Sequence, residues 1–307
     1  MPTTLVCFAS WEPRFFEGVN NSFHKESPST CIVIFSNEYA SRTAENRKKI
    51  AQIAKEKNIS LLEIPIDLTS SIGCWSALVS SLPANISKKS EVLFDISTTP
   101  REALWYILHI LDALDCRTRW IYYRPKDYAE NWLSRNALSP HLLLKRSGIA
   151  LPGRKTCIVA LAGFDSERLA QLIERYEPTQ CFVGRQTGDQ LGNPTRNTGF
   201  DDPFVKQKNI KLFDFNCYDA SHDPLQKLMS ELPADIWEKF NVIGTALGPK
   251  PSAITMFMLT QIHPDMGLVY IPSGDYNPEY SVGIDLTNIS EGVVPTLTSI
   301  QMQSEIS

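Results

Sequence analysis

One stretch in the first half of the chain decides the fold: Val92-Leu93-Phe94-Asp95-Ile96-Ser97-Thr98-Thr99-Pro100-Arg101. An apolar run ends abruptly in small hydroxyl side chains, and Pro100 stands where a proline fits the first turn of a helix. The residues from Arg101 to Leu114 are then strongly apolar. The stretch predicts a buried strand, a polar loop and a buried helix in direct succession.

The same alternation extends outward in both directions. Further strand patterns lie at 4–9, 31–35, 61–66, 120–123, 157–162, 180–183, 210–215, 240–243 and 268–271. Helical patterns lie between them at 43–57, 74–82, 166–175, 225–232 and 251–262. Continuous apolar strands that alternate with helices are typical of parallel strands covered on both faces. The sequence predicts an α/β protein of two tandem, doubly wound, Rossmann-like domains, with boundaries at 1–145 and 155–290 and a tail at 291–307.

Two loops indicate an internal duplication. Residues 123–134 and 270–281 both contain Tyr-x-Pro, then Asp-Tyr, then an aromatic residue and Ser. They follow Pro100 and Pro249 at nearly equal spacing. We therefore expect the two domains to be related by pseudo-two-fold symmetry, joined near 139–155, where Pro and Gly interrupt the periodicity.

One segment departs from this plan. Residues 184–202 are rich in Gly, Asn, Thr, Asp and Arg and almost without apolar side chains. Such a segment is too polar to pack and longer than the usual connection. Two interpretations stay open, a functional lid and a disordered insertion.

Composition excludes several classes of protein. The chain has 307 residues, with 30 Lys and Arg against 34 Asp and Glu and a net charge of −4, which gives no support to binding of duplex DNA through bulk charge. No apolar run is long enough to span a membrane, and the N-terminus lacks the features of a secretory signal. The seven cysteines are scattered singly, without a metal-binding spacing. We expect a cytoplasmic protein with reduced cysteines, no metal site and no cofactor.

The loop at 95–101 is the first candidate site, because open parallel sheets bind ligands outside the carboxyl ends of their strands. Small residues let the amides at a helix start approach an anion, and the hydroxyls of Ser97, Thr98 and Thr99 are additional donors. Arg101 offers a bidentate contact to phosphate or carboxylate. The alternative is that Thr98 or Thr99 caps the helix while Arg101 lies on the surface.

The corresponding loop of the second half is residues 244–252. Gly248 allows a turn with a positive φ, Lys250 places a positive charge near the helix start, and Ser252 follows. The loop is not a Walker A motif, and no Gly-x-Gly-x-x-Gly follows a first strand, which disfavours a P-loop NTPase and an NAD(P) dehydrogenase. In the loop after the first strand, Ser10 and Trp11 offer an aromatic ring for stacking on a base, or the ring merely covers the sheet edge.

Catalytic residues are not assigned. The chain has no Gly-x-Ser-x-Gly elbow, and its histidines share no spacing with a Ser or Cys nucleophile. His109 and His263 lie on the two apolar helices that follow the candidate loops, where a buried core histidine is the better interpretation.

The placement of residues 95–101 and 248–251 resembles the CARF domains of CRISPR-associated sensor proteins. The resemblance implies a doubly wound domain that dimerises and binds cyclic oligoadenylate across the two-fold with the loop after its fourth strand. The family's double glycine is absent from the first half, and Arg101 stands where a lysine is usual. The residues that the resemblance assigns to the ligand are Ser10, Trp11, Ser97, Thr98, Thr99, Arg101, Gly248, Pro249, Lys250 and Ser252.

These observations lead to one expected function and two alternatives. We expect a sensor in prokaryotic antiviral defence that binds an anionic nucleotide-type ligand, with a cyclic oligonucleotide as one candidate, between its two halves, and signals to a separate effector protein. The first alternative is an enzyme that uses the same pocket, either a metal-independent phosphodiesterase of the ring-nuclease kind or a nucleotide-modifying transferase. The second is a protein-interaction scaffold.

Overall fold

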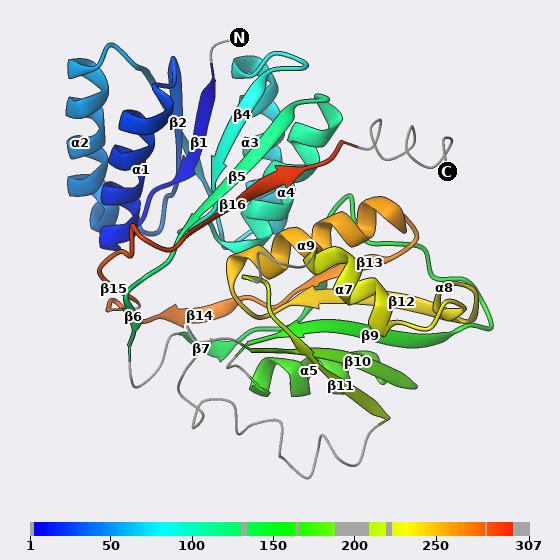
Figure 1. The fold of residues 1–307 in the computed structure, drawn as a ribbon. Coiled ribbons are helices and arrows are strands. Elements are labelled where there is room, and N and C mark those ends of the chain that lie inside the picture. Colours follow the sequence, from blue (N-terminus) through cyan, green and yellow to red (C-terminus); the bar gives the residue numbers. More distant parts are fainter. Residues whose placement is uncertain are drawn as a thin grey trace. The chain divides into compact units, whose positions relative to one another are not determined.

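The computed structural model describes residues 3–129, 134–163, 166–187, 209–218, 223–279 and 281–296. The chain forms two compact units, the first from Met1–Arg135 with Asp275–Ser307 and the second from Asn136–Gly274 (Figure 1). Most of the polar segment 184–202 lies outside the described residues. Its first residues belong to a strand, because β10 continues to Gln186 and Arg185 bonds to Asp214 at 2.8 Å.

The first unit is built on a sheet of order β16-β5-β4-β1-β2-β3. Strands β1 to β5 run parallel, and β16 runs antiparallel to β5. The strands are β1 (Thr4–Phe8), β2 (Thr30–Ser36), β3 (Ser60–Ile66), β4 (Glu91–Asp95), β5 (Arg117–Tyr123) and β16 (Ile289–Val294). The order reverses between β1 and β4, so the carboxyl ends of these two strands flank the place where such sheets bind ligands.

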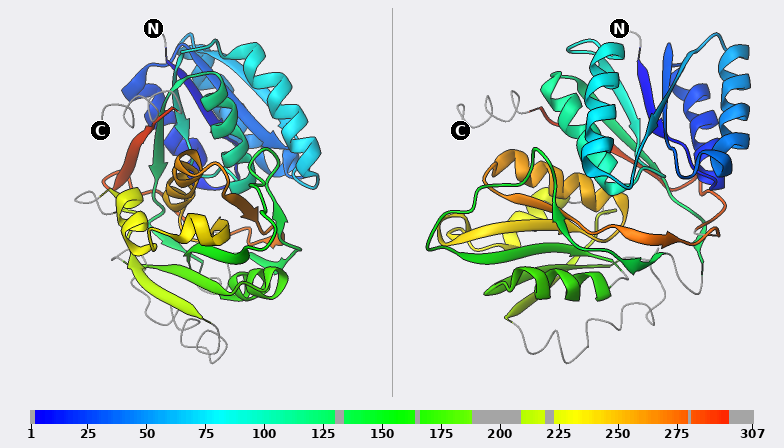
Figure 2. Two further views of the ribbon diagram at one scale, coloured as in Figure 1. Left: turned by 90° about the vertical axis from the view of Figure 1, so that its right-hand side faces the viewer. Right: turned by 180° about the vertical axis from the view of Figure 1, so that it is seen from behind.

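Helices cover both faces of this sheet. They are α1 (Pro13–Glu26), α2 (Ala40–Glu56), α3 (Ser71–Asn85) and α4 (Arg101–Ala113). Phe15 and Val19 of α1 pack with Ile50 of α2 against Leu5 and Val33 in one buried cluster. Right-handed crossovers place α3 and α4 on the opposite face, because the strand order has reversed (Figure 2). The predicted doubly wound arrangement is confirmed for this unit.

The second unit repeats the plan with a sheet of order β11-β10-β9-β12-β13-β8. Its strands are β9 (Lys155–Ala162), β10 (Gln180–Gln186), β11 (Ile210–Phe215), β12 (Phe240–Ala246), β13 (Gly267–Tyr270) and β8 (His141–Leu142). Its helices are α5 (Ser166–Tyr176), α7 (Pro224–Glu231), α8 (Ile236–Lys239) and α9 (Lys250–Ile262). Strands β9 to β13 run parallel, and β8 pairs antiparallel with β13. An α/β fold with the same strand order is therefore present in both units.

The antiparallel edge strands differ from the predicted boundaries. β16 follows the second half of the chain but pairs along its whole length with β5 of the first unit, and β8 follows the first half but pairs with β13. Residues 275–290 thus belong to the first unit rather than to a C-terminal domain, and the residues of β16 are a strand rather than a tail. The outer edge of β5 would otherwise expose unpaired amides and carbonyls, which explains why a distant strand covers it.

Short strands lie where the chain passes between the units. These are β6 (Asp127–Tyr128), β7 (Ser134–Ala137), β14 (Ser273–Tyr276) and β15 (Ser281–Val282). β6 pairs with β15, and β7 pairs with β14. None of the described helices combines the length and the apolarity that are needed to cross a bilayer.

Candidate functional site

The loop between β4 and α4 is held by the carboxylate of Asp95. The amide and the hydroxyl of Ser97 both donate to Asp95 Oδ1, at 2.9 and 2.5 Å. The same Ser97 hydroxyl accepts from the amide of Tyr123 at 2.8 Å. Thr99 Oγ1 donates to the carbonyl of Asp95 at 3.2 Å, and Thr98 Oγ1 donates to the carbonyl of Phe8 at 2.6 Å. The loop is therefore tied to the ends of β1, β4 and β5.

These bonds decide which groups of the loop can meet a ligand. The side chains of Ser97 and Thr99 are fully buried and donate within the unit, so both residues shape the loop. Thr98 and Arg101 are half-buried. The N-cap of α4 is Pro100, which makes no side-chain hydrogen bond to the helix. The first amides of α4 and the Arg101 guanidinium are the groups that suit an anion here.

Asp95 is a buried acid directly beneath this helix start. Burial raises the pKa of Asp95 to about 6, although the bonds from Ser97 and the charge of Arg14 act in the opposite direction. A carboxyl group with this pKa is largely ionised at neutral pH but gains a proton under mildly acidic conditions. The protonation state of Asp95 thus changes the field at the start of α4.

The loop after β1 is held by a buried ion pair that the sequence analysis did not identify. Arg14 Nη2 lies 2.6 Å from Glu12 Oε2, and Arg14 Nη1 donates to the carbonyl of Tyr123 at 3.3 Å. Ser10 Oγ donates to Glu12 Oε1 at 3.4 Å, and the hydroxyl of Ser281 donates to Glu12 Oε2. Ser10 is itself buried and belongs to this framework. The signal in the sequence was opposite charges two positions apart beside Pro13, which many surface loops share.

In the second unit, the loop between β12 and α9 corresponds to the loop between β4 and α4 but has fewer side-chain hydrogen bonds among those described. The amides of Leu247 and Gly248 both donate to the carbonyl of Leu161, at 2.8 and 3.0 Å, so the end of β12 is tied to β9. Lys250 is half-buried at the first position of α9, whose N-cap is Pro249 and carries no side-chain cap. Ser252 is fully buried and donates its hydroxyl to the Pro249 carbonyl at 2.6 Å.

The prediction of a positive φ at Gly248 is wrong. Among the described residues, the glycines with positive φ are Gly148, Gly153 and Gly283. A Cβ atom at Gly248 would lie 3.1 Å from the Ala162 carbonyl oxygen, a tight contact that favours glycine where these two strand ends meet.

The predicted residues thus form two groups, one in each unit. Ser10, Trp11, Ser97, Thr98, Thr99 and Arg101 lie in the loops at the carboxyl ends of β1 and β4, and Gly248, Lys250 and Ser252 lie at the carboxyl end of β12. No group of three or more His, Cys, Asp and Glu side chains that could hold a metal ion occurs in the part of the chain that the structure describes. His263 stacks on Trp237 with ring centroids 3.6 Å apart, and burial lowers its pKa.

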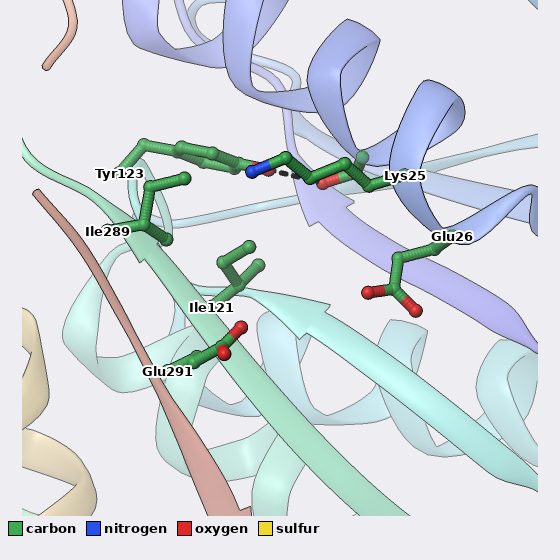
Figure 3. A pocket seen from close by; sticks show the side chains of 7 residues that line it. Lys25, Glu26, Ile121, Tyr123, Ile289 and Glu291 are labelled. Atoms are coloured by element: carbon green, nitrogen blue, oxygen red, sulfur yellow. Dashed lines mark hydrogen bonds between the residues drawn. The ribbon is translucent and has the colours of Figure 1, made fainter. Parts of the chain in front are cut away.

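A small cavity lies elsewhere in the first unit, between α1 and the strands β5 and β16 (Figure 3). Its volume is about 130 Å³, well below the several hundred Å³ of a typical ligand pocket. Lys25 and Glu26 of α1 and Glu291 of β16 line it with opposite charges, and the Tyr123 hydroxyl already bonds to Ser22 at 2.8 Å. None of the residues that line it belongs to the loops after β1 and β4, so this cavity is not the candidate site.

The chain is similar to several solved structures. A type III CRISPR defence DNA nuclease that is activated by cyclic oligoadenylate matches 83% of this chain with a TM-score of 0.52 and 8% sequence identity. Can2 from Sulfobacillus thermosulfidooxidans, solved with cyclic tetra-adenylate, matches 38% with a TM-score of 0.30 and 9% identity. Protein VC1899 from Vibrio cholerae also matches 38%, with a TM-score of 0.31 and 15% identity.

The chain spans 63% of the nuclease, 31% of Can2 and 30% of the Vibrio protein, so it is similar to a part of each. No protein-family model matches the chain, and no curated protein does. The match to the nuclease is longer than either unit, and it shows a shared fold.

Proposed function

We propose that the protein is a CARF-like sensor that binds an anionic nucleotide-type ligand at the carboxyl ends of its sheets, with cyclic oligoadenylate as the leading candidate. One observation carries the proposal: α4 and α9 occupy the same position in the two strand orders, and each begins at an uncapped turn with a cation at its first residue, Arg101 or Lys250. A helix start of this kind brings the positive end of the helix dipole and a formal charge to one point.

The structural neighbours agree with this choice of ligand. The nuclease that shares the fold is activated by cyclic oligoadenylate. A role in antiviral defence, with the signal passed to a separate effector protein, is part of the same proposal. The framework residues Ser97, Thr99 and Ser252 hold the loops, while the helix amides, Thr98, Arg101 and Lys250 are the proposed ligand contacts.

We also propose that the units arose by duplication and are related by a pseudo-two-fold axis. The equal strand orders support this, and so does the reciprocal origin of the edge strands β8 and β16. A crystal structure tests it directly, since the two sheets should superpose strand for strand by a rotation close to 180°. A rotation far from that value would overturn the symmetry.

Calorimetric titration of the full chain tests the ligand. The probes are cyclic tri-, tetra- and hexa-adenylate, linear tetra-adenylate and ATP. We expect a cyclic oligoadenylate to bind tightest, and Arg101→Gln and Lys250→Gln each to weaken it at least about tenfold, which corresponds to about 1.4 kcal/mol. Arg117→Gln is the matched control, because that side chain is 83% exposed in a weak pair with Glu91 at 3.9 Å.

Four results would contradict the proposal or change it. Equal affinity of the wild type and both variants would exclude the two helix starts as the binding site. A stoichiometry of two ligands per chain would show that each end binds its own ligand. Product formed on long incubation with the ligand would favour the phosphodiesterase, and absence of binding by every probe would favour the interaction scaffold.

A further inference from the structure

An aromatic group with one cation lies beside the proposed anion site of the first unit. Trp11 follows β1, Tyr39 follows β2, and Tyr276 ends β14. The rings of Trp11 and Tyr39 have centroids 5.2 Å apart, and Tyr276 meets Tyr39 edge-on at 6.5 Å. Arg42, in the first turn of α2, completes the group. We call these four residues the aromatic platform.

Arg42 is an exposed cation that lies over two rings of this group. Its guanidinium carbon lies 5.6 Å from the ring centroid of Trp11 and 5.7 Å from that of Tyr39. The side chain is exposed and has no hydrogen-bond or ion-pair partner among the described residues. Arg47, one turn further along the same helix, is by contrast bound to Glu63 at 2.8 Å. Of the two arginines, Arg47 is the one held by an ion pair to a strand.

The loop that carries Trp11 is fixed on both sides. Asn46 Nδ2 of α2 donates to the carbonyl of Ser10 at 3.0 Å, and the Glu12–Arg14 ion pair holds the residues that follow. Thr98 bonds to the carbonyl of Phe8, so the start of α4 is tied to the strand that leads into Trp11. A rigid aromatic surface next to an anion site needs little ordering when a ligand binds.

The rings are suited to stacking rather than to the core. All three are half-buried, so each presents part of its surface to solvent. Burial, followed by the charge of Glu38, raises the pKa of Tyr39, so this ring is a neutral phenol at physiological pH. Every nucleobase has a π-face that stacks on such rings, and an arginine beside them can bind the neighbouring phosphate.

We propose that the aromatic platform binds a nucleobase of the ligand and that Arg42 binds an adjacent phosphate, so that Trp11, Tyr39 and Tyr276 determine the preference for a base. This inference rests on the proposed function, because it places a nucleobase next to the phosphate that the start of α4 is proposed to bind. It assigns new roles to Tyr39, Arg42 and Tyr276.

Two probes that differ only in the base test the platform: AMP and ribose 5-phosphate, titrated into the full chain at millimolar concentration. We expect the wild type to bind AMP at least tenfold more tightly. Trp11→Leu should remove this difference and leave the affinity for ribose 5-phosphate unchanged, and Trp11→Phe should restore part of it. Arg42→Gln should weaken both probes equally, whereas Lys49→Gln on the same helix should weaken neither.

The outcomes separate this inference from the proposed function. If both probes bind equally to the wild type and Arg101→Gln weakens both, the anion site stands and the platform is refuted. If Trp11→Leu weakens the two probes to the same extent, its effect is structural and the platform is refuted as well. If neither probe binds, and cyclic oligoadenylates do not bind either, both proposals fail together.

Discussion

Replacement of Arg14 by methionine tests whether a buried ion pair holds the loop after β1. The Arg14 side chain is 3% exposed and that of Glu12 is 11% exposed, with the charged atoms 2.6 Å apart. Lys49 and Glu45 of α2 form a pair of the same length on the surface, with side chains 48% and 80% exposed. The two pairs share their distance and differ in burial, so Lys49→Met is the matched control.

The expected magnitudes differ about tenfold. Removal of one partner from a buried pair leaves an uncompensated charge and costs about 3–5 kcal/mol. An exposed pair one helical turn apart contributes about 0.3–0.5 kcal/mol. The Arg14 guanidinium also donates to the Tyr123 carbonyl, which adds to the loss. Addition of Glu12→Gln to Arg14→Met removes the stranded carboxylate, so the double variant should be more stable than the single one.

Urea denaturation followed by tryptophan fluorescence measures these changes. With a dependence of about 1–3 kcal/mol per molar urea, a loss of 3 kcal/mol lowers the midpoint by about 1 M or more. Lys49→Met should leave the midpoint almost unchanged. Equal small shifts for Arg14→Met and Lys49→Met would refute the reasoning, and so would a double variant less stable than Arg14→Met.

Three further predictions concern single positions. In the folded state Asp95 titrates near pH 6 and not near its ordinary value of 3.8, so the folded chain holds this proton more tightly. As the pH rises from 3.8 to about 6, the free energy of unfolding of the wild type relative to Asp95→Asn should therefore fall by about 1.4 kcal/mol per pH unit. A difference that does not change with pH would contradict the burial argument. Gly163→Ala places a Cβ atom 2.8 Å from the Leu247 carbonyl oxygen and should cost about 1–3 kcal/mol in thermal or urea unfolding, whereas no loss would show that the turn can move freely. Gly292→Val brings a Cβ atom within 2.8 Å of Trp120 Nε1, so β16 should separate from β5 and its amides should exchange faster with deuterium; unchanged protection would count against a tight contact.

The candidate site could be predicted from the sequence only in part. The polar loop 95–101 and its helix were recognised from residues adjacent in the chain, and the structure places them as expected at the end of a parallel strand. The inward direction of the Ser97 and Thr99 hydroxyls was not predicted, because it depends on Asp95 lying beneath them. Trp11 was recognised as a ring that could stack on a base, but Tyr39 and Tyr276 were missed because they come from separate segments and each alone resembles an ordinary surface aromatic.

Local periodicity in the sequence determined the alternation of strands and helices, the doubly wound class and the loops that follow β4 and β12. These features depend on neighbours within a few residues, where hydrophobic spacing and turn residues carry the information. Tertiary structure alone decided that β16 completes the first sheet and β8 the second, and that Ser281 bonds to Glu12. The physical reason is that the edge of a sheet can pair with a strand from any distance along the chain. The hydrophobic pattern of such a strand does not indicate which sheet edge it will pair with.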